Sequence, residues 1–180
     1  MEIIEFPVLK VNSKTFQIES VFHTYIKPKI NPELTIFCVK LTGILQETVD
    51  RGVDFKTALQ MFENWMRNES LINESGDVKQ SFAFVTFGNW DIGKMLIDQC
   101  KLSEVEVPPY MKSWINVKNS FSDTMRYWPT SLHHMMSAIQ IPVVGRLHSG
   151  IDDCRNIVSA MKYLAELGHV FKITHNLNEK

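Results

Sequence analysis

The stretch LHSGIDDCRN (147–156) contains a histidine followed five residues later by an aspartate, with a glycine between them. Asp152 and Asp153 stand where carboxylates favour the start of a helix. One interpretation is therefore that Asp152 caps a helix and that His148 lies in a surface loop. The other is that His148 and Asp153 belong to a reaction site. With six histidines in the chain, a chance pairing of this kind is common, so the rest of the sequence has to decide.

A second carboxylate, Asp91, follows the apolar run SFAFVTF (81–87) in the stretch VTFGNWDIGK. Ligands of open α/β sheets lie at the carboxyl ends of strands, so Asp91 is well placed to reach a metal ion. It is equally well placed to cap the helix that follows. Trp90 is interpreted as a core residue rather than as one that stacks on a base.

Asp91, Asp153 and His148 suit one class of reaction if their helices pack on the same side of the sheet. Carboxylate oxygens are the ligands that Mg²⁺ prefers. Two such ions stabilise both the attacking and the leaving oxygen when a phosphodiester is cleaved. A histidine with a pKa near ~6.5 can accept the proton of the attacking water.

The elements that would position these residues begin with β-branched, alternating segments and continue with helices and strands in turn. The first predicted elements are a hairpin over 2–11 and 15–26, bent at Pro7, and a helix from Asp54 to Asn68. A strand over 81–87, buried on both faces, a helix from Asp91 and a strand or loop over 114–121 follow. The last are a short helix over 131–139, a helix from Asp152 to Leu167 and a strand over 169–174. This order predicts a three-layer α/β domain with a mixed sheet.

The bulk composition narrows the functional class. The chain has 180 residues and a formal net charge of −1, so any site for a polyanion must be a local patch or use metal ions. The three cysteines fit neither a zinc site nor a disulfide framework. No apolar run approaches the length of a membrane span. We expect one domain over 1–180 in a reducing intracellular compartment, cytoplasmic or nuclear, without a membrane partner.

Five ordered blocks give the sequence a resemblance that covers nearly the whole chain. The blocks are EIIEFP (2–7), FCVKLTGI (37–44), FVTFGNWD (84–91), WINVK (114–118) and GRLHSGIDDCRNI (145–157). In order and spacing they resemble the ERI-type 3'–5' exoribonucleases, the DEDDh branch of the DnaQ-like nucleases, and within these the prion-protein-interacting branch. The resemblance implies a ribonuclease-H-like exonuclease fold, with a mixed sheet flanked by helices.

The resemblance also assigns roles to individual residues. Asp91 and Asp153 match metal-binding carboxylates, and His148 matches the general base. The implied cofactors are two Mg²⁺ or Mn²⁺ ions, and the implied partner is a single-stranded RNA 3' end. Asp152 does not match, because the family spacing from the histidine is five residues.

Two further segments match parts of the family that lie near nucleic acid. The residues that match the segment against the terminal nucleotides are Phe37, Leu41, Thr42 and Gly43. For Phe37 and Leu41, ordinary core packing is the alternative. Asn116 and Lys118 match a motif near the nucleic-acid path, where Lys118 could pair with a phosphate.

One family motif has no match in this chain. It is an Asp-x-Glu pair on a first strand, which the family places upstream of the EIIEFP block and inside the sheet. Glu5 lies nearby but is a poor substitute by position. Without that strand, two rows of backbone groups would lack partners, at a cost of roughly 1–3 kcal/mol for each buried group. The flanking strands could close up, another chain could fill the gap, or this chain could be a shortened product of a longer protein, which is the interpretation we favour.

Three hypotheses follow. The leading one is a 3'–5' exoribonuclease-family domain that acts on RNA 3' ends by two-metal hydrolysis, inactive or weak in this chain because the first acidic motif is absent. The second is a non-catalytic module that binds RNA or protein and keeps the fold. The third is an unstable fragment without a function of its own.

Overall fold

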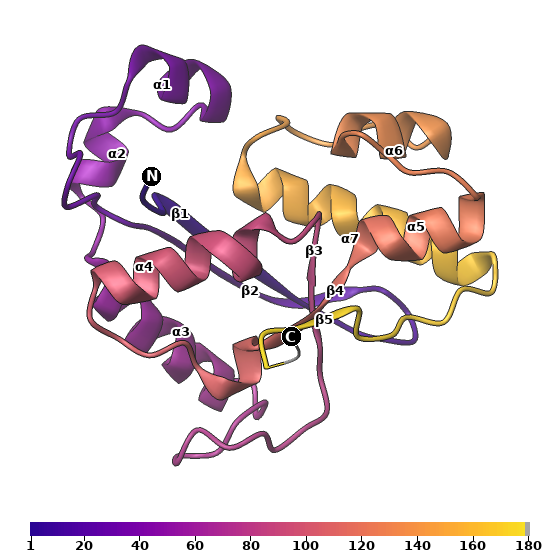
Figure 1. The fold of residues 1–180 in the computed structure, drawn as a ribbon, viewed down its shortest axis with the longest axis horizontal. Coiled ribbons are helices and arrows are strands. Elements are labelled where there is room, and N and C mark those ends of the chain that lie inside the picture. The colour runs from indigo at the N-terminus through magenta and orange to yellow at the C-terminus, as the bar shows by residue number, and fades with distance from the viewer. Residues whose placement is uncertain (179–180) are drawn as a thin grey trace.

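The computed structural model describes residues 1–178, in which the strands form two separate sheets (Figure 1). The strands are β1 (Glu5–Val11), β2 (Ile18–Tyr25), β3 (Phe84–Thr86), β4 (Ser113–Asn116) and β5 (His175–Asn176). β1 and β2 form an antiparallel hairpin. β3 runs parallel to β4, and β4 runs antiparallel to β5, which makes the second sheet mixed.

Helices separate and cover these strands. They are α1 (Ile36–Thr42), α2 (Gln46–Asp50), α3 (Phe55–Asn68), the π-helical turn η1 (Asp91–Leu96) that continues into α4 (Ile97–Leu102), the short 3-10 turn η2 (Pro109–Met111), α5 (Val117–Met125), α6 (Leu132–Ala138) and α7 (Gly150–Glu166). Together they confirm the predicted α/β class.

Helix α3 holds the hairpin through an aromatic cluster. Its apolar face repeats at helical spacing, and Asp54 accepts a hydrogen bond from the Thr57 amide at its start. The Phe62 ring is fully buried and lies 5.0 Å from Phe6 and 6.3 Å from Phe84, centroid to centroid. One helix therefore covers a strand of each sheet.

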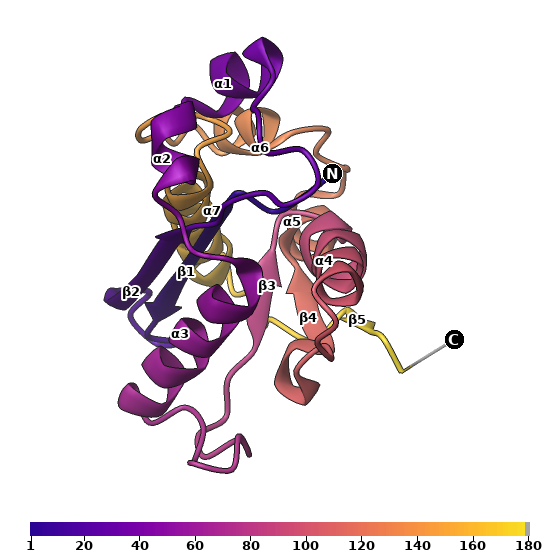
Figure 2. The same cartoon turned by 90° about the vertical axis from the view of Figure 1, so that its left-hand side faces the viewer.

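A second core joins the C-terminal helices. α7 packs against β1, α5 and α6. The residues of this core that are fully or almost fully buried are Val117, Phe121, Leu132, Met135, Met136, Ile139, Ala160 and Leu164. Because β1 belongs to the first core as well, α7 ties the two halves of the molecule together (Figure 2).

The two sheets do not join. Within the described residues β1 pairs with β2 alone and β3 with β4 alone, so one backbone edge of each strand has no strand partner. Every residue of β1 and β3 is only half-buried. The run 81–87 was predicted to be a strand buried on both faces, and that prediction is wrong: the strand covers three residues, because nothing pairs with its far edge.

Other local expectations also need correction. Pro7 stays in register opposite His23, and the irregularity of the hairpin falls at Lys10 and Val11. Residues 117–121 begin helix α5, and the last strand covers 175–176 rather than 169–174. Residues 169–174 have side chains suited to a strand, but a strand forms only where a partner strand is in reach. The last strand pairs with β4 only at Ser113 and Trp114, which lie opposite Asn176 and His175.

Candidate active site

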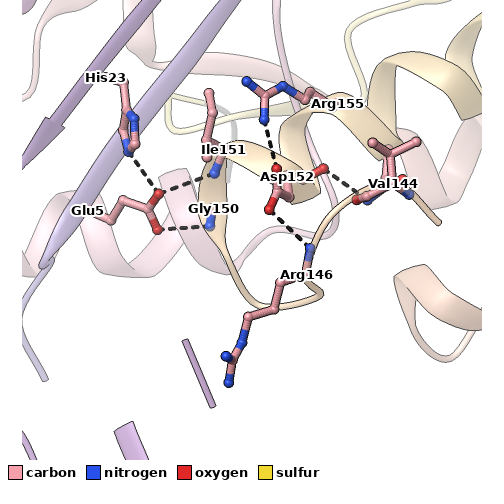
Figure 3. A network of polar contacts seen from close by, with 9 residues as sticks. Glu5, His23, Val144, Arg146, Gly150, Ile151, Asp152 and Arg155 are labelled. Atoms are coloured by element: carbon pink, nitrogen blue, oxygen red, sulfur yellow. Dashed lines mark hydrogen bonds and ion pairs between the residues drawn. The ribbon is translucent and has the colours of Figure 1, made fainter. Parts of the chain in front are cut away.

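Helix α7 begins at a carboxylate that comes from the other end of the chain. The Gly150 amide donates to Glu5 Oε2 at 2.8 Å and the Ile151 amide to Glu5 Oε1 at 3.3 Å (Figure 3). His23 Nε2 lies 2.9 Å from Glu5 Oε1. Amides at a helix start lack partners within the helix, so Glu5 supplies the cap. The expectation that Asp152 caps this helix is wrong: it lies in the first turn.

Gly150 is required by close packing against β1. A Cβ placed there would lie 2.9 Å from Glu5 Oε2 and 2.9 Å from Pro7 Cγ. The backbone before it is unusual, because His148 has a φ of 69°, in the left-handed region that non-glycine residues seldom adopt. Such conformations persist where the surroundings hold them and are concentrated at functional sites.

The two neighbouring aspartates of α7 have different surroundings. Asp152 accepts from the Arg146 amide at 3.0 Å and pairs with Arg155 at 2.7 Å (Figure 3). The bond from the Arg146 amide holds the pKa of Asp152 below its usual value. Within residues 1–178 the Asp153 carboxyl accepts a hydrogen bond only from the His148 amide, at 3.2–3.3 Å, and burial raises the pKa of Asp153. The Asp152 carboxylate is therefore already bound to groups of the protein, whereas the Asp153 carboxylate can still accept hydrogen bonds or bind a ligand.

Asp91 begins η1 just beyond the end of β3. The turn between them is held by Asn116, whose Oδ1 accepts from the Gly88 amide at 3.0 Å. Asp91 is open to solvent on one side but surrounded by protein on the others, and this dehydration raises the pKa of its carboxyl. The carboxyl does not cap its helix through its side chain, since the residue at the cap position is Trp90.

Trp90 does not lie in the core, contrary to the prediction from the sequence. The side chain is 57% exposed, so it is not a core residue. A single exposed ring is ordinary on a protein surface, but one that directly precedes a carboxylate can stack on a base bound there. The sequence contained a signal for this, because Trp90 stands at the cap position before the helix, outside the apolar face that Ile92 and Leu96 bury.

The carboxylates converge on one thiol. Burial raises the pKa of Cys154 to about 12, and the negative charges of Glu5, Asp153 and Asp91 add to that rise. The His148 ring lies close enough to Asp153 to lower the pKa of that carboxyl in part. The structure thus brings Asp91, Asp153 and His148 into one region, although they come from two helix starts.

Helix α1 and the Gly43 that follows it carry the four residues predicted to face the terminal nucleotides, and none of the α1 side chains is buried. Phe37 is 73% exposed and Leu41 37% exposed, which contradicts core packing for these two. Thr42 Oγ1 donates to Cys38 O, and Gly43 ends the helix with a φ of 78°.

An arginine connects α1 to the segment that carries His148. A Cβ on Gly43 would lie 3.1 Å from an Arg146 nitrogen, and the Arg146 guanidinium donates to Lys40 O. Sequence reasoning missed Arg146, because its partners are more than a hundred residues away in the chain. This contact joins the exposed apolar helix to the loop before α7.

Asn116 and Lys118 lie at the start of α5. Asn116 is 2% exposed, and the same Oδ1 that accepts from Gly88 also accepts from the Lys118 amide at 3.0 Å. Asn116 thus positions the turn before Asp91 from inside. Lys118 is half-buried, and its ammonium group lies over aromatic rings.

The chain is similar in sequence and in structure to known exonucleases. A family model described as RNase_T, exonuclease, matches residues 1–161. ERI1 exoribonuclease 3 of Homo sapiens is 44% identical over 174 residues, and 3'-5' exonuclease Snipper of Drosophila melanogaster is 38% identical over 184 residues. The nuclease domain of 3'hExo, a DEDDh family member solved with bound rAMP, superimposes with a TM-score of 0.91 at 36% identity. The chain belongs to the DEDDh 3'–5' exonuclease family.

Each match takes in almost all of this chain but a smaller share of the relative. The match to the human ERI1 exoribonuclease 3 takes in 96% of this chain and 50% of the relative, and the match to Snipper 98% and 65%. The match to the 3'hExo nuclease domain takes in 97% of this chain and 86% of that one. The chain spans about half the length of the mammalian ERI1 exoribonuclease 3 proteins that it matches. None of the described helices is both long and apolar enough to cross a membrane.

DEDDh exonucleases typically use divalent metal ions, and the residues present can be tested against that requirement. The oxygens of Asp91 and Asp153 have suitable donor chemistry. Within residues 1–178, however, no three side chains of His, Cys, Asp or Glu gather closely enough to hold one ion. Glu5 is committed to the start of α7. Within the described part of the chain, Asp91 and Asp153 are therefore two carboxylates without a third protein ligand beside them.

Proposed function

We propose that this chain is an exoribonuclease-type domain that binds the 3' end of single-stranded RNA at Asp91, His148 and Asp153. The observation that carries the proposal is that the carboxylates of Asp91 and Asp153, from two different helix starts, come together near Cys154. Nearby protein raises the pKa of both carboxyls, and the exposed Trp90 directly precedes Asp91. Because phosphates repel carboxylates, binding there requires cations, and the proposed cations are Mg²⁺ or Mn²⁺.

The exposed side chains suit a terminal nucleotide. Phe37 and Leu41 on α1 and Trp90 at the start of η1 present apolar surface. Bases of single-stranded RNA stack on aromatic side chains, which removes such surface from water. A solved relative is described as recognising the histone mRNA stem-loop at its 3' end, which supports the same kind of ligand for this chain.

His148 is the proposed proton acceptor in a completed site. Its backbone is fixed in the left-handed region, and its amide is bound to Asp153. A neutral imidazole near the attacking water can take its proton as the bond to phosphorus forms. The product of hydrolysis at the last linkage is a nucleoside 5'-monophosphate.

We propose that an extended segment, paired between β1 and β3, completes the site. Each of these strands has one backbone edge without a strand partner, and both are half-buried throughout. A strand paired there would bury those edges, and an Asp-x-Glu pair on it would add the carboxylates that the resemblance requires. This segment could come from a longer form of this chain or from a partner protein.

The 180-residue chain is therefore expected to be inactive or very weak. The test is trimming of a labelled single-stranded RNA with Mg²⁺ or Mn²⁺, with and without a synthetic β-strand peptide that contains Asp-x-Glu. We expect trimming only with the peptide, and its loss on Asp91→Asn or Asp153→Ala. Asp98→Ala, at an exposed carboxylate on α4, is the matched control and should leave trimming unchanged. Rapid trimming without peptide, abolished by Asp153→Ala, would contradict the proposed inactivity.

A second candidate function rests on the lack of any three-ligand group within residues 1–178. In that case the domain binds RNA or protein without chemistry. RNA affinity would then be the same in Mg²⁺ and in EDTA and would not respond to Asp91→Asn. A metal titration in the presence and absence of RNA separates the two functions.

A further inference from the structure

A lysine held between two aromatic rings lies just outside the candidate active site. The Lys118 ammonium nitrogen is 5.1 Å from the centroid of Phe87 and 5.0 Å from that of Trp128. Both distances are within the range in which a cation is attracted to a ring face. Among the described residues, no carboxylate lies within ion-pair distance of this lysine. Its charge is thus oriented but not neutralised.

The same surface continues along the segment between α5 and α6. Trp128 is 50% exposed and Tyr127 37% exposed. Pro129, next to them, is among the fully buried residues, and the Tyr127 ring packs edge-on against the buried Phe121 at 5.2 Å between centroids, so the segment is anchored on the core while Trp128 stays open. We call Phe87, Lys118, Tyr127 and Trp128 the aromatic strip.

The aromatic strip is connected to the active site by a shared acceptor. Asn116 Oδ1 accepts from the Gly88 amide and from the Lys118 amide, both at 3.0 Å. Gly88 follows Phe87 and lies in the turn that leads to Asp91. The strip therefore starts at the same turn that positions a site carboxylate, on the side of α5.

We propose that the aromatic strip binds single-stranded RNA upstream of the 3' end, with a phosphate on Lys118 and a base on the exposed face of Trp128. The chemistry is that of single-strand binding sites, in which cations track the backbone and aromatic rings stack on bases. A ligand without an anionic group would leave the Lys118 charge unpaired, and a ligand without a planar group would leave the exposed face of Trp128 uncovered. The inference rests on the proposed RNA-end binding and extends it to nucleotides that do not react.

The experiment measures the affinity of the whole chain for oligouridylates of two lengths, a dinucleotide and a strand of about ten nucleotides, in Mg²⁺. The variants are Trp128→Ala, Trp128→Phe and Lys118→Gln. Lys101→Gln, at an exposed lysine on α4, is the matched charge control. Circular dichroism melts confirm that each variant is folded.

The strip predicts a dependence on length. Trp128→Ala should weaken binding of the longer strand roughly tenfold and leave the dinucleotide unchanged, while Trp128→Phe restores most of the loss. Lys118→Gln should reduce the slope of log affinity against log salt by about 0.7, the change for one phosphate contact on a single strand, and Lys101→Gln should not. A purely structural role of Trp128 would not discriminate between the lengths.

Three negative results are distinguishable. If the unaltered chain binds the longer strand and Trp128→Ala binds it equally well, the aromatic strip is overturned and the proposed function stands. If the unaltered chain binds neither RNA, the proposed function and the strip both fail. Equal losses for the two lengths would also overturn the strip, because they would place Trp128 at the terminal nucleotide.

Discussion

The two helix starts that form the candidate site differ in how their polar groups are satisfied. At the start of α7, Glu5 caps the first amides, Asp152 holds the preceding loop, and the fully buried Asn156 bonds to both the amide and the carbonyl of Val144. At the start of η1, the Asp91 carboxyl is dehydrated, and no side chain within residues 1–178 neutralises it.

This difference separates scaffold from ligand site. Bonded polar groups stabilise the fold, whereas a dehydrated carboxylate without partners destabilises it until a ligand binds. The α7 start is therefore organised by the protein alone, and the η1 start remains dependent on what binds there. Removing groups from the two regions should change stability in opposite directions.

The largest effect is expected from Asn156→Ala. It removes three hydrogen bonds of 2.9–3.0 Å from a fully buried amide and leaves the Val144 amide and carbonyl without their partner. We expect a loss of about 3 kcal/mol in the free energy of unfolding, measured by urea denaturation. Ser159→Ala, on the same helix, is the control and should lose less than about 0.5 kcal/mol. Equal losses for the two would show that α7 does not depend on this network.

A smaller loss is expected from Glu5→Ala. The variant leaves the Gly150 and Ile151 amides uncapped and removes the partner of His23. A charged acceptor at a helix start is worth about 2 kcal/mol, and Glu5→Gln, which keeps one acceptor, should lose about half of that. Amide hydrogen exchange at Gly150 and Ile151 locates the effect. Unchanged exchange there would mean that solvent can replace Glu5.

The smallest change, and one of opposite sign, is expected from Asp91→Asn. Its pKa is raised in the folded state, so the folded protein binds more protons and stability falls as pH rises above the ordinary aspartate value. Asp91→Asn should remove that fall and be more stable than the unaltered chain at neutral pH, with no difference in acid. Melting temperatures across the pH range measure this.

Asp152→Asn is the matched comparison. The pKa of Asp152 is lowered, first by the Arg146 amide, so its contribution to stability is present above the ordinary value and lost as pH falls through the lowered one. Asp152→Asn should therefore be less stable at neutral pH. If both variants shift the melting temperature in the same direction, the distinction between scaffold and ligand site fails.

The elements predicted best from sequence are those with strong local signals. Helix α3 begins and ends as predicted, because Asp54 caps it and its apolar spacing is regular. The hairpin was predicted from alternation alone and is observed. Helix α5 was missed, since its start depends on the buried Asn116, whose side chain caps it through the Lys118 amide. A two-residue strand such as β5 has no sequence signal of its own.

The sequence by itself determined the residue types of the site, the spacing of His148 and Asp153, and the family resemblance, because these depend on local order along the chain. Only the tertiary structure decided which carboxylates are already bonded. Glu5 and Gly150 are 145 residues apart and meet only when β1 packs on α7. Exposure was likewise decided in three dimensions: Trp90 and Trp128 are apolar residues that the packed helices leave uncovered.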